Sequence, residues 1–154
     1  MKNYIHLIVV CLLVVSCGTK TVVNKEMVIK ESQSMAAKTD TNKSLKEIKT
    51  EGALTDKEGF KDIGTFKYSE FYDEKTNEIL KIKNVETTDK TITETYYFED
   101  NNVYLIVSES SQKPTKKIYV HRGKIVSNEN TNSDEQQLLL DKAKRFQKSF
   151  KKNH

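Results

Sequence analysis

The chain has 154 residues, a formal net charge of +4, a hydrophobic fraction of 36% and a charged fraction of 31%. This length leaves room for one folded domain, and the polar composition predicts that part of the chain does not fold. Six Lys or Arg residues and one Asp lie between residues 138 and 154, so the basic character belongs to one terminal segment. A domain that is basic throughout is therefore excluded.

The first 16 residues are typical of a signal peptide. Lys2 is followed by an apolar run of 11 residues, Ile5–Val15, interrupted only by His6. A helix needs about 20 apolar residues to cross a hydrocarbon core of about 30 Å, so this run is too short for a permanent membrane span. A charged start followed by a short apolar run predicts export of the chain.

The end of this run, Val14-Val15-Ser16-Cys17, resembles the lipobox of bacterial lipoproteins, in which an aliphatic residue, a tolerant position and a small residue precede a Cys. The resemblance implies that the Cys17 thiol takes a diacylglycerol group and that a signal peptidase cleaves between Ser16 and Cys17. A fatty acid such as palmitate would then acylate the new amino group. One acyl chain binds a membrane only marginally, so lasting attachment needs two or three. A soluble secreted protein and an uncleaved anchor helix are the alternatives.

Lipidation would leave no free cysteine in the exported domain and would determine the membrane to which the protein is attached. Cys11 lies in the removed segment and Cys17 would carry lipid, so the exported domain would have neither a free thiol nor a disulfide. By the same resemblance, Gly18 in place of an Asp favours the outer over the inner membrane of a Gram-negative envelope. We therefore expect the membrane as a partner, through lipid on Cys17, and no nucleic acid.

Aromatic residues mark where folding is expected to begin. None occurs between Gly18 and Gly59, whereas twelve follow from Phe60 onward. Residues 18–58 carry too little apolar surface to offset the entropy lost on ordering. We expect a signal peptide over residues 1–16, a lipidated Cys and disordered tether over 17–58, and a folded domain over 59–154. A short helix over residues 43–49 is the alternative within the tether.

Six segments after Phe60 have the composition of β-strands and are separated by short polar turns. Asp100–Asn102 and Arg122-Gly123 are typical of tight hairpins. This spacing predicts an antiparallel meander of five to six strands with one buried face and one wet face. Alternation places Val103, Leu105 and Val107 together on one face. The expected strands are 63–72, 79–86, 91–99, 103–108, 117–121 and 124–127.

The apolar period becomes helical near the end of the chain. Ser133 with Gln136 predicts a capping box at the start of a helix over residues 134–151. Its apolar stripe is Leu139, Ala143, Phe146 and Phe150. We expect this helix to cover the apolar face of the sheet, which gives an α+β fold.

The basic residues of this helix are the first candidate site. They are suited to an anionic envelope component or an acidic protein partner, whereas a solvated outer helix face is the alternative. These residues are Lys142, Lys144, Arg145, Lys148, Lys151 and Lys152.

Aromatic residues on the wet face are the second candidate site. Tyr97 and Tyr104 fall opposite their core-side neighbours and are expected to cluster there as a ligand surface. Ordinary cross-strand packing is the alternative.

No catalytic motif, metal-ligand cluster or cofactor fingerprint occurs in the sequence, and we expect no metal and no cofactor. The first hypothesis is a non-enzymatic envelope lipoprotein that binds a protein or an anionic envelope component. The second is a small-ligand binder or transport accessory that uses the aromatic sheet face. The third is an enzyme with a carboxylate pair that has no recognisable motif.

Overall fold

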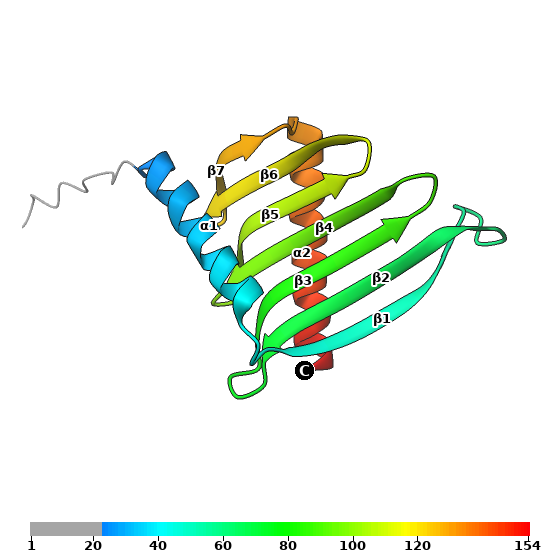
Figure 1. Cartoon of the computed structure of the whole chain (residues 1–154), viewed down its shortest axis with the longest axis horizontal. Coiled ribbons are helices and arrows are strands. Elements are labelled where there is room, and N and C mark those ends of the chain that lie inside the picture. The colour runs from blue at the N-terminus through cyan, green and yellow to red at the C-terminus, as the bar shows by residue number, and fades with distance from the viewer. Residues whose placement is uncertain (1–22) are drawn as a thin grey trace, which may run out of the picture.

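A computed structural model describes residues 23–154, so Ser16 and Cys17 lie outside the described residues. A seven-stranded antiparallel sheet follows the chain order β1 to β7, with one helix before it and one after it (Figure 1). The α+β class, the meander and the C-terminal helix are confirmed, and the sheet has one strand more than the upper count expected. The elements are α1 (Lys25–Thr41), β1 (Lys46–Thr55), β2 (Asp62–Asp73), β3 (Glu78–Thr87), β4 (Thr91–Glu99), β5 (Asn102–Ser110), β6 (Lys113–His121), β7 (Lys124–Glu129) and α2 (Ser133–Asn153).

The tight turns lie where the sequence predicts them. Asp100 and Asn101 have φ of 49° and 59° between β4 and β5, and Arg122 and Gly123 have φ of 51° and 74° between β6 and β7. Positive φ at both central residues matches the right-handed twist of the flanking strands. These turns join neighbouring strands directly and produce the meander.

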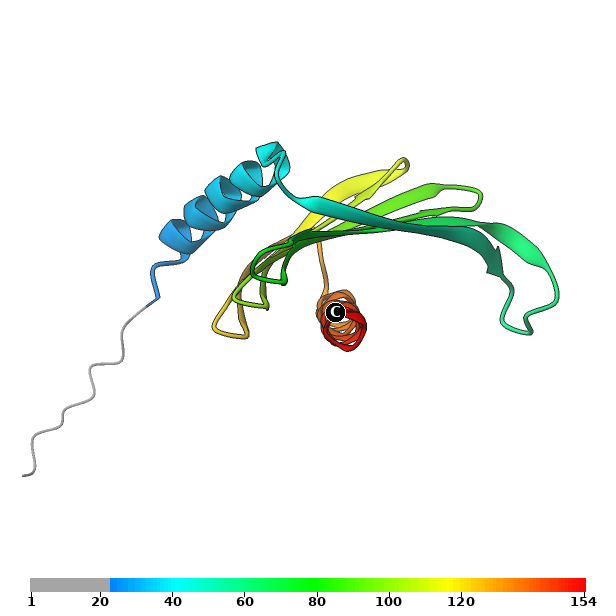
Figure 2. The ribbon, with the colours of Figure 1, turned by 90° about the horizontal axis from the view of Figure 1, so that it is seen from below.

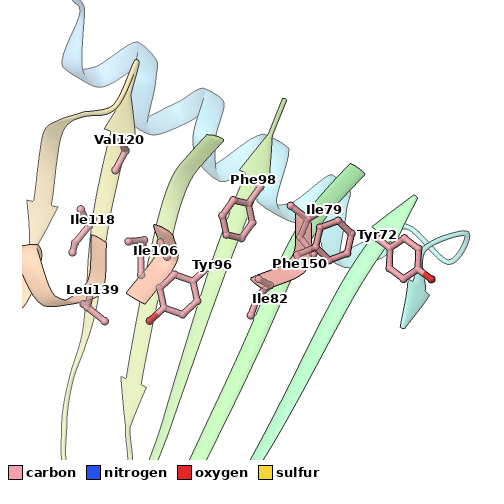
Figure 3. Packing of buried hydrophobic residues seen from close by; sticks show 11 residues of the cluster. Tyr72, Ile79, Ile82, Tyr96, Phe98, Ile106, Ile118, Val120, Leu139 and Phe150 are labelled. Atoms are coloured by element: carbon pink, nitrogen blue, oxygen red, sulfur yellow. The ribbon is translucent and has the colours of Figure 1, made fainter. Parts of the chain in front are cut away.

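The two helices lie on opposite faces of the sheet, and the sheet curves around α2 (Figure 2). The main core fills the space between the sheet and α2 (Figure 3). The predicted stripe of α2 is confirmed: Leu139, Ala143 and Phe150 are buried, and Phe146 packs against the same cluster. The buried sheet residues of this cluster are Tyr72, Ile79, Ile82, Tyr96, Phe98, Ile106, Ile118 and Val120.

The capping box of α2 lies one residue earlier than expected. Asn132, not Ser133, is the N-cap: its side chain accepts the Glu135 N–H at 2.9 Å, and the Glu135 carboxylate accepts the Asn132 N–H at 3.3 Å. Asn and Ser are about equally good N-caps, so residue type alone does not choose between them. The choice follows from Glu135, which stands three residues after Asn132 and completes the box.

The expected tether is wrong for residues 25–55, which form α1 and β1. Helix α1 begins at the N-cap Asn24, whose side chain accepts the Met27 N–H, and it buries Val28, Ser32 and Ala36 at a spacing of four. Helix α1 needs no aromatic residue, because these small side chains pack against apolar side chains of the sheet. Strand β1 pairs with β2 from Lys46 to Thr55 and is held mainly by backbone hydrogen bonds. The alternative helix over 43–49 is also replaced by this strand.

The second face of the sheet is therefore not wet where α1 lies. Helix α1 covers a second cluster, and Leu105 and Val107 belong to it while Val103 belongs to the main core. The expectation that these three share a face is wrong because the register shifts between the pairs Tyr97–Leu105 and Phe98–Val103. The buried members of the second cluster are Ala36, Tyr97, Tyr104, Leu105 and Tyr119.

In the part of the chain that the structure describes, neither helix combines the length and the apolar character that crossing a membrane requires.

Candidate ligand groove

A groove separates α2 from strands β1, β2 and β3. It consists of two adjoining hollows of about 530 Å³ and about 410 Å³, which share Phe66, Tyr68 and Ser149 in their linings. We call it the α2 groove. It follows α2 from Lys142 to His154, a distance of about 18 Å at 1.5 Å per residue. Each hollow is within or near the range of about 300–1,000 Å³ that is typical of small-molecule sites.

One wall of the larger hollow is formed by three aromatic residues and a leucine. Leu54 of β1, Phe66 and Tyr68 of β2, and Phe146 of α2 line it. The Tyr68 and Phe146 rings lie 5.2 Å apart between centroids, tilted by 46°. Phe66 and Tyr68 are two residues apart on β2 and therefore point to the same face of the sheet.

A buried carboxylate lies beside the larger hollow. Glu94 is only 7% exposed and accepts the Tyr96 hydroxyl at 2.8 Å and the Lys142 ammonium at 2.9 and 3.0 Å. An unpaired charge at this depth would be costly, so Lys142 and Tyr96 satisfy it. The Lys142 ammonium is therefore already paired within the fold.

The polar side of the larger hollow also carries an amide and two further charged groups. Asn84 of β3 is buried, and its Nδ2 donates to Glu86 Oε1 at 2.9 Å. Arg145 lies one α2 position before Phe146 and lines the same hollow. Within residues 23–154, Arg145 makes no ion pair and no side-chain hydrogen bond.

The smaller hollow ends at a second buried carboxylate. Glu70 is 6% exposed and accepts the Tyr68 hydroxyl at 2.9 Å, and its Oε2 lies 3.6 Å from His154 Nε2. The His154 ring stacks on Phe150 with centroids 4.3 Å apart. Asn77 donates to the His154 carbonyl at 3.1 Å, which fixes the end of α2 against the β2–β3 turn.

The two tyrosines that donate to these buried carboxylates stay protonated over the physiological range. Burial, and next the negative charge of Glu70, raises the pKa of Tyr68 well above its ordinary value. Burial and then Glu94 raise the pKa of Tyr96 in the same way. Both hydroxyls therefore act as neutral donors to carboxylates and are not bases or nucleophiles at neutral pH.

The basic residues predicted on α2 do not act as one set. Lys142 pairs with Glu94, and Lys144 pairs with Asp141 at 3.3 Å. Arg145, although exposed, lines the groove, whereas Lys148, Lys151 and Lys152 are exposed outside it. The proposed contact with an anionic partner stays a prediction for these exposed residues.

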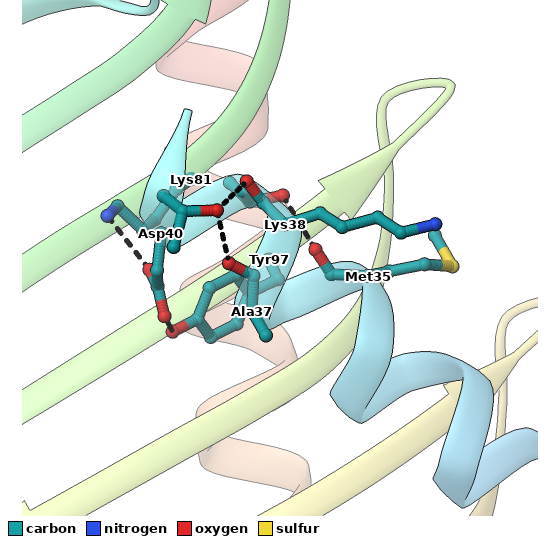
Figure 4. Close-up of polar contacts among 8 residues, drawn as sticks. Met35, Ala37, Lys38, Asp40, Lys81 and Tyr97 are labelled. Atoms are coloured by element: carbon teal, nitrogen blue, oxygen red, sulfur yellow. Dashed lines mark hydrogen bonds and ion pairs between the residues drawn. The ribbon is translucent and has the colours of Figure 1, made fainter. Parts of the chain in front are cut away.

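Tyr97 and Tyr104 do lie together, with ring centroids 6.2 Å apart, but α1 covers them. They are 7% and 8% exposed, so their surface is closed to a ligand while α1 is in place. The Tyr97 hydroxyl donates to Asp40 Oδ2 at 3.0 Å, and Lys81 donates to Asp40 Oδ1 at 3.0 Å (Figure 4). Burial raises the pKa of Tyr104 to about 12.

Ser16 and Cys17, the expected cleavage and lipidation residues, lie outside the described residues. Among residues 23–154 no group of three or more His, Cys, Asp and Glu side chains is close enough to hold a metal ion.

Sequence reasoning missed the α2 groove because its lining comes from β1, β2, β3 and α2. One signal was present. Glu94 and Glu70 each stand on a strand face otherwise occupied by apolar residues, and a carboxylate in that position needs partners. Searching for those partners leads to Tyr68, Tyr96 and Lys142.

No protein-family model, no curated protein and no solved structure matches this chain.

Proposed function

We propose that this chain is a lipid-anchored protein of the cell envelope, placed in the outer membrane if the envelope is Gram-negative, whose domain is a non-enzymatic module that binds a small molecule in the α2 groove. The observation that carries the proposal is the groove itself, which combines an aromatic wall with charged groups at its rim. Such a mixture is typical of binding sites, in which apolar walls supply affinity and a few polar groups fix orientation.

Binding is favoured over catalysis by the state of the buried carboxylates. Glu70 and Glu94 each accept a tyrosine hydroxyl, and Glu94 also holds Lys142. A general acid or base has to exchange its proton with a substrate and lie within hydrogen-bond reach of it. Carboxylates whose oxygens are taken by neighbouring side chains are suited to supporting the groove.

Anchoring through Cys17 would hold the domain close to the membrane. Seven residues lie between Cys17 and Lys25, the first residue of α1. At about 3.6 Å per residue they span at most about 30 Å. The start of α1 would therefore stay within about 30 Å of the lipid, and the ligand would come from the membrane surface or the fluid beside it.

The anchor is tested by metabolic labelling with an alkyne analogue of palmitate. The wild-type protein is expected to incorporate label and to sediment with membranes. Cys17→Ser is expected to lose both properties, whereas Cys11→Ser retains them. Equal labelling of wild type and Cys17→Ser would contradict the anchor.

The groove is tested by photo-crosslinking in intact cells. A benzophenone amino acid at Thr50 faces the groove, and the same group at Lys49, the neighbouring residue on β1, points to the other side of the sheet. Thr50 is expected to yield a small-molecule adduct by mass spectrometry and Lys49 is not. Absence of an adduct at Thr50, or the same adduct at both positions, argues against the groove.

A second candidate function is contact with an anionic envelope component through α2. Lys148, Lys151 and Lys152 are exposed and make no ion pair within residues 23–154. Neutralising these three residues is expected to abolish cross-links to such a partner in intact cells without changing the yield at Thr50. Unchanged cross-links would remove this candidate.

A further inference from the structure

One cation of the α2 groove is left for a ligand. Lys142 is occupied by the buried Glu94, and the Glu86 carboxylate accepts the Asn84 amide. Arg145 has no such partner within residues 23–154, and it lines the larger hollow beside Phe146. A guanidinium presents a fixed fork of donors that matches a carboxylate or a phosphate.

The surface next to Arg145 is apolar over a long stretch. Leu54, Phe66, Tyr68 and Phe146 line the same hollow, and Ile48 continues this surface into the smaller hollow. Phe66 is only partly buried, so the protein leaves an aromatic ring accessible here. Covering such a surface is worth about 25 cal/mol for each Å² of apolar area removed from water.

From this juxtaposition we infer that the ligand is an amphiphile with one anionic head group, a carboxylate or a phosphate. Arg145 binds the head group, and the apolar part lies against Phe66, Tyr68 and Phe146. This inference rests on the proposed binding function. The volume of about 530 Å³ suits one such molecule.

Glu86 distinguishes this ligand from a cationic amphiphile. Its carboxylate lines the same hollow and repels an anionic head, whereas it would attract an ammonium group. Neutralising Glu86 therefore strengthens the binding of an anionic amphiphile and weakens the binding of a cationic one. Arg145→Gln weakens the binding of the anionic amphiphile only.

The test uses the chain from position 17 onward, which contains every described residue, with Cys17→Ser so that no lipid and no detergent is needed. Displacement of 1-anilinonaphthalene-8-sulfonate fluorescence is measured with four probes of equal chain length: dodecanoate, dodecyl phosphate, dodecanol and dodecylammonium. The two anions are expected to bind about tenfold more tightly than dodecanol, and dodecylammonium most weakly. The ratio of dodecanoate to dodecyl phosphate separates a free fatty acid from a phosphate head group.

Single substitutions test which side chains hold the head group of the ligand. Arg145→Gln is expected to lower the affinity for both anions about tenfold and leave dodecanol unchanged. Lys124→Gln, an exposed cation on β7 outside the groove, leaves all four unchanged, and Glu86→Gln tightens the anions. Equal affinity for all four probes, or no effect of Arg145→Gln, overturns the anionic ligand while leaving the groove function standing. Absence of binding by every probe, together with no adduct at Thr50, overturns both.

Discussion

The Phe66 ring lies against the backbone of Gly52, its partner in the β1–β2 register. A Cβ at position 52 would lie 2.9 Å from Phe66 Cε1, which is closer than carbon atoms pack. Glycine at this position of β1 therefore leaves the space that the Phe66 ring occupies beside the edge strand. The shape of the groove depends on a backbone position that contributes no side chain to it.

Gly52→Ala is expected to push the Phe66 ring away from β1 and to lower the affinity of the α2 groove for dodecanoate several-fold. The free energy of unfolding is expected to change by less than about 1 kcal/mol, because β1 is an exposed edge strand. Fluorescence displacement and urea unfolding measure the two quantities. Gly59→Ala is the control: it strains a turn with φ of 79° where no atom lies near the added methyl, and it leaves the affinity unchanged. Equal affinities of wild type and Gly52→Ala would contradict the role of this contact.

The Glu94–Lys142 pair should respond asymmetrically to removal of either partner. The Lys142 side chain is 22% exposed and that of Glu94 only 9%. Lys142→Met leaves an uncompensated buried carboxylate and is expected to cost about 3 kcal/mol of unfolding free energy. Glu94→Gln is expected to lower the unfolding free energy by less, because the Lys142 ammonium still reaches water. The double variant with Lys142→Met and Glu94→Gln is expected to recover part of the unfolding free energy that Lys142→Met loses. Urea unfolding of the four proteins gives the coupling energy, and strict additivity of the two single changes would disprove the pairing.

Helix α1 should detach when a charge is placed in its contact with the sheet. Ala36 is 7% exposed and packs in the cluster with Tyr97, Tyr104 and Tyr119, whereas Ala37 is exposed. Ala36→Asp is expected to speed amide hydrogen exchange over residues 25–41 by at least about tenfold, because an unpaired carboxylate cannot stay buried there. Exchange in β4 and α2 should stay slow, and Ala37→Asp should behave as wild type. Unchanged exchange in Ala36→Asp would mean that α1 does not depend on this contact.

The cap of α2 predicts one part of the pH dependence of stability. The hydrogen bond from Lys116, and next the Asn132 N–H, lower the pKa of Glu135 below its ordinary value of 4.5. The carboxylate therefore stabilises the fold above about pH 4.5, and this contribution is lost as the pH falls below that value. Wild type and Glu135→Gln should differ in their urea midpoints near pH 7, and the difference should shrink as the pH falls below about 4.5. A difference that is constant with pH would rule out the charge of Glu135 as its source.

The elements that could be predicted are those whose apolar spacing or turn residues lie within one short segment of the sequence. The stripe Leu139, Ala143 and Phe150 and the turns at Asp100 and Gly123 depend on local spacing and local backbone conformation, so the meander and α2 could be predicted.

Elements that depend on a partner could not be predicted. Helix α1 has few large apolar residues, and its stability comes from burying Val28, Ser32 and Ala36 against side chains of β5, β6 and β7. Strand β1 satisfies its backbone on β2 and keeps most of its side chains exposed. The α2 groove needs four elements at once, so no single segment of sequence contains its pattern.

The strand order repeats the chain order, and this has a consequence for how the molecule folds. Every strand pairs with its neighbour in sequence, so closing each pair costs little chain entropy and the sheet can grow hairpin by hairpin. Helix α1 forms differently, because it precedes all the strands in the chain yet contacts β5, β6 and β7. Its burial has to await the last strands, which makes the docking of α1 a late step in folding.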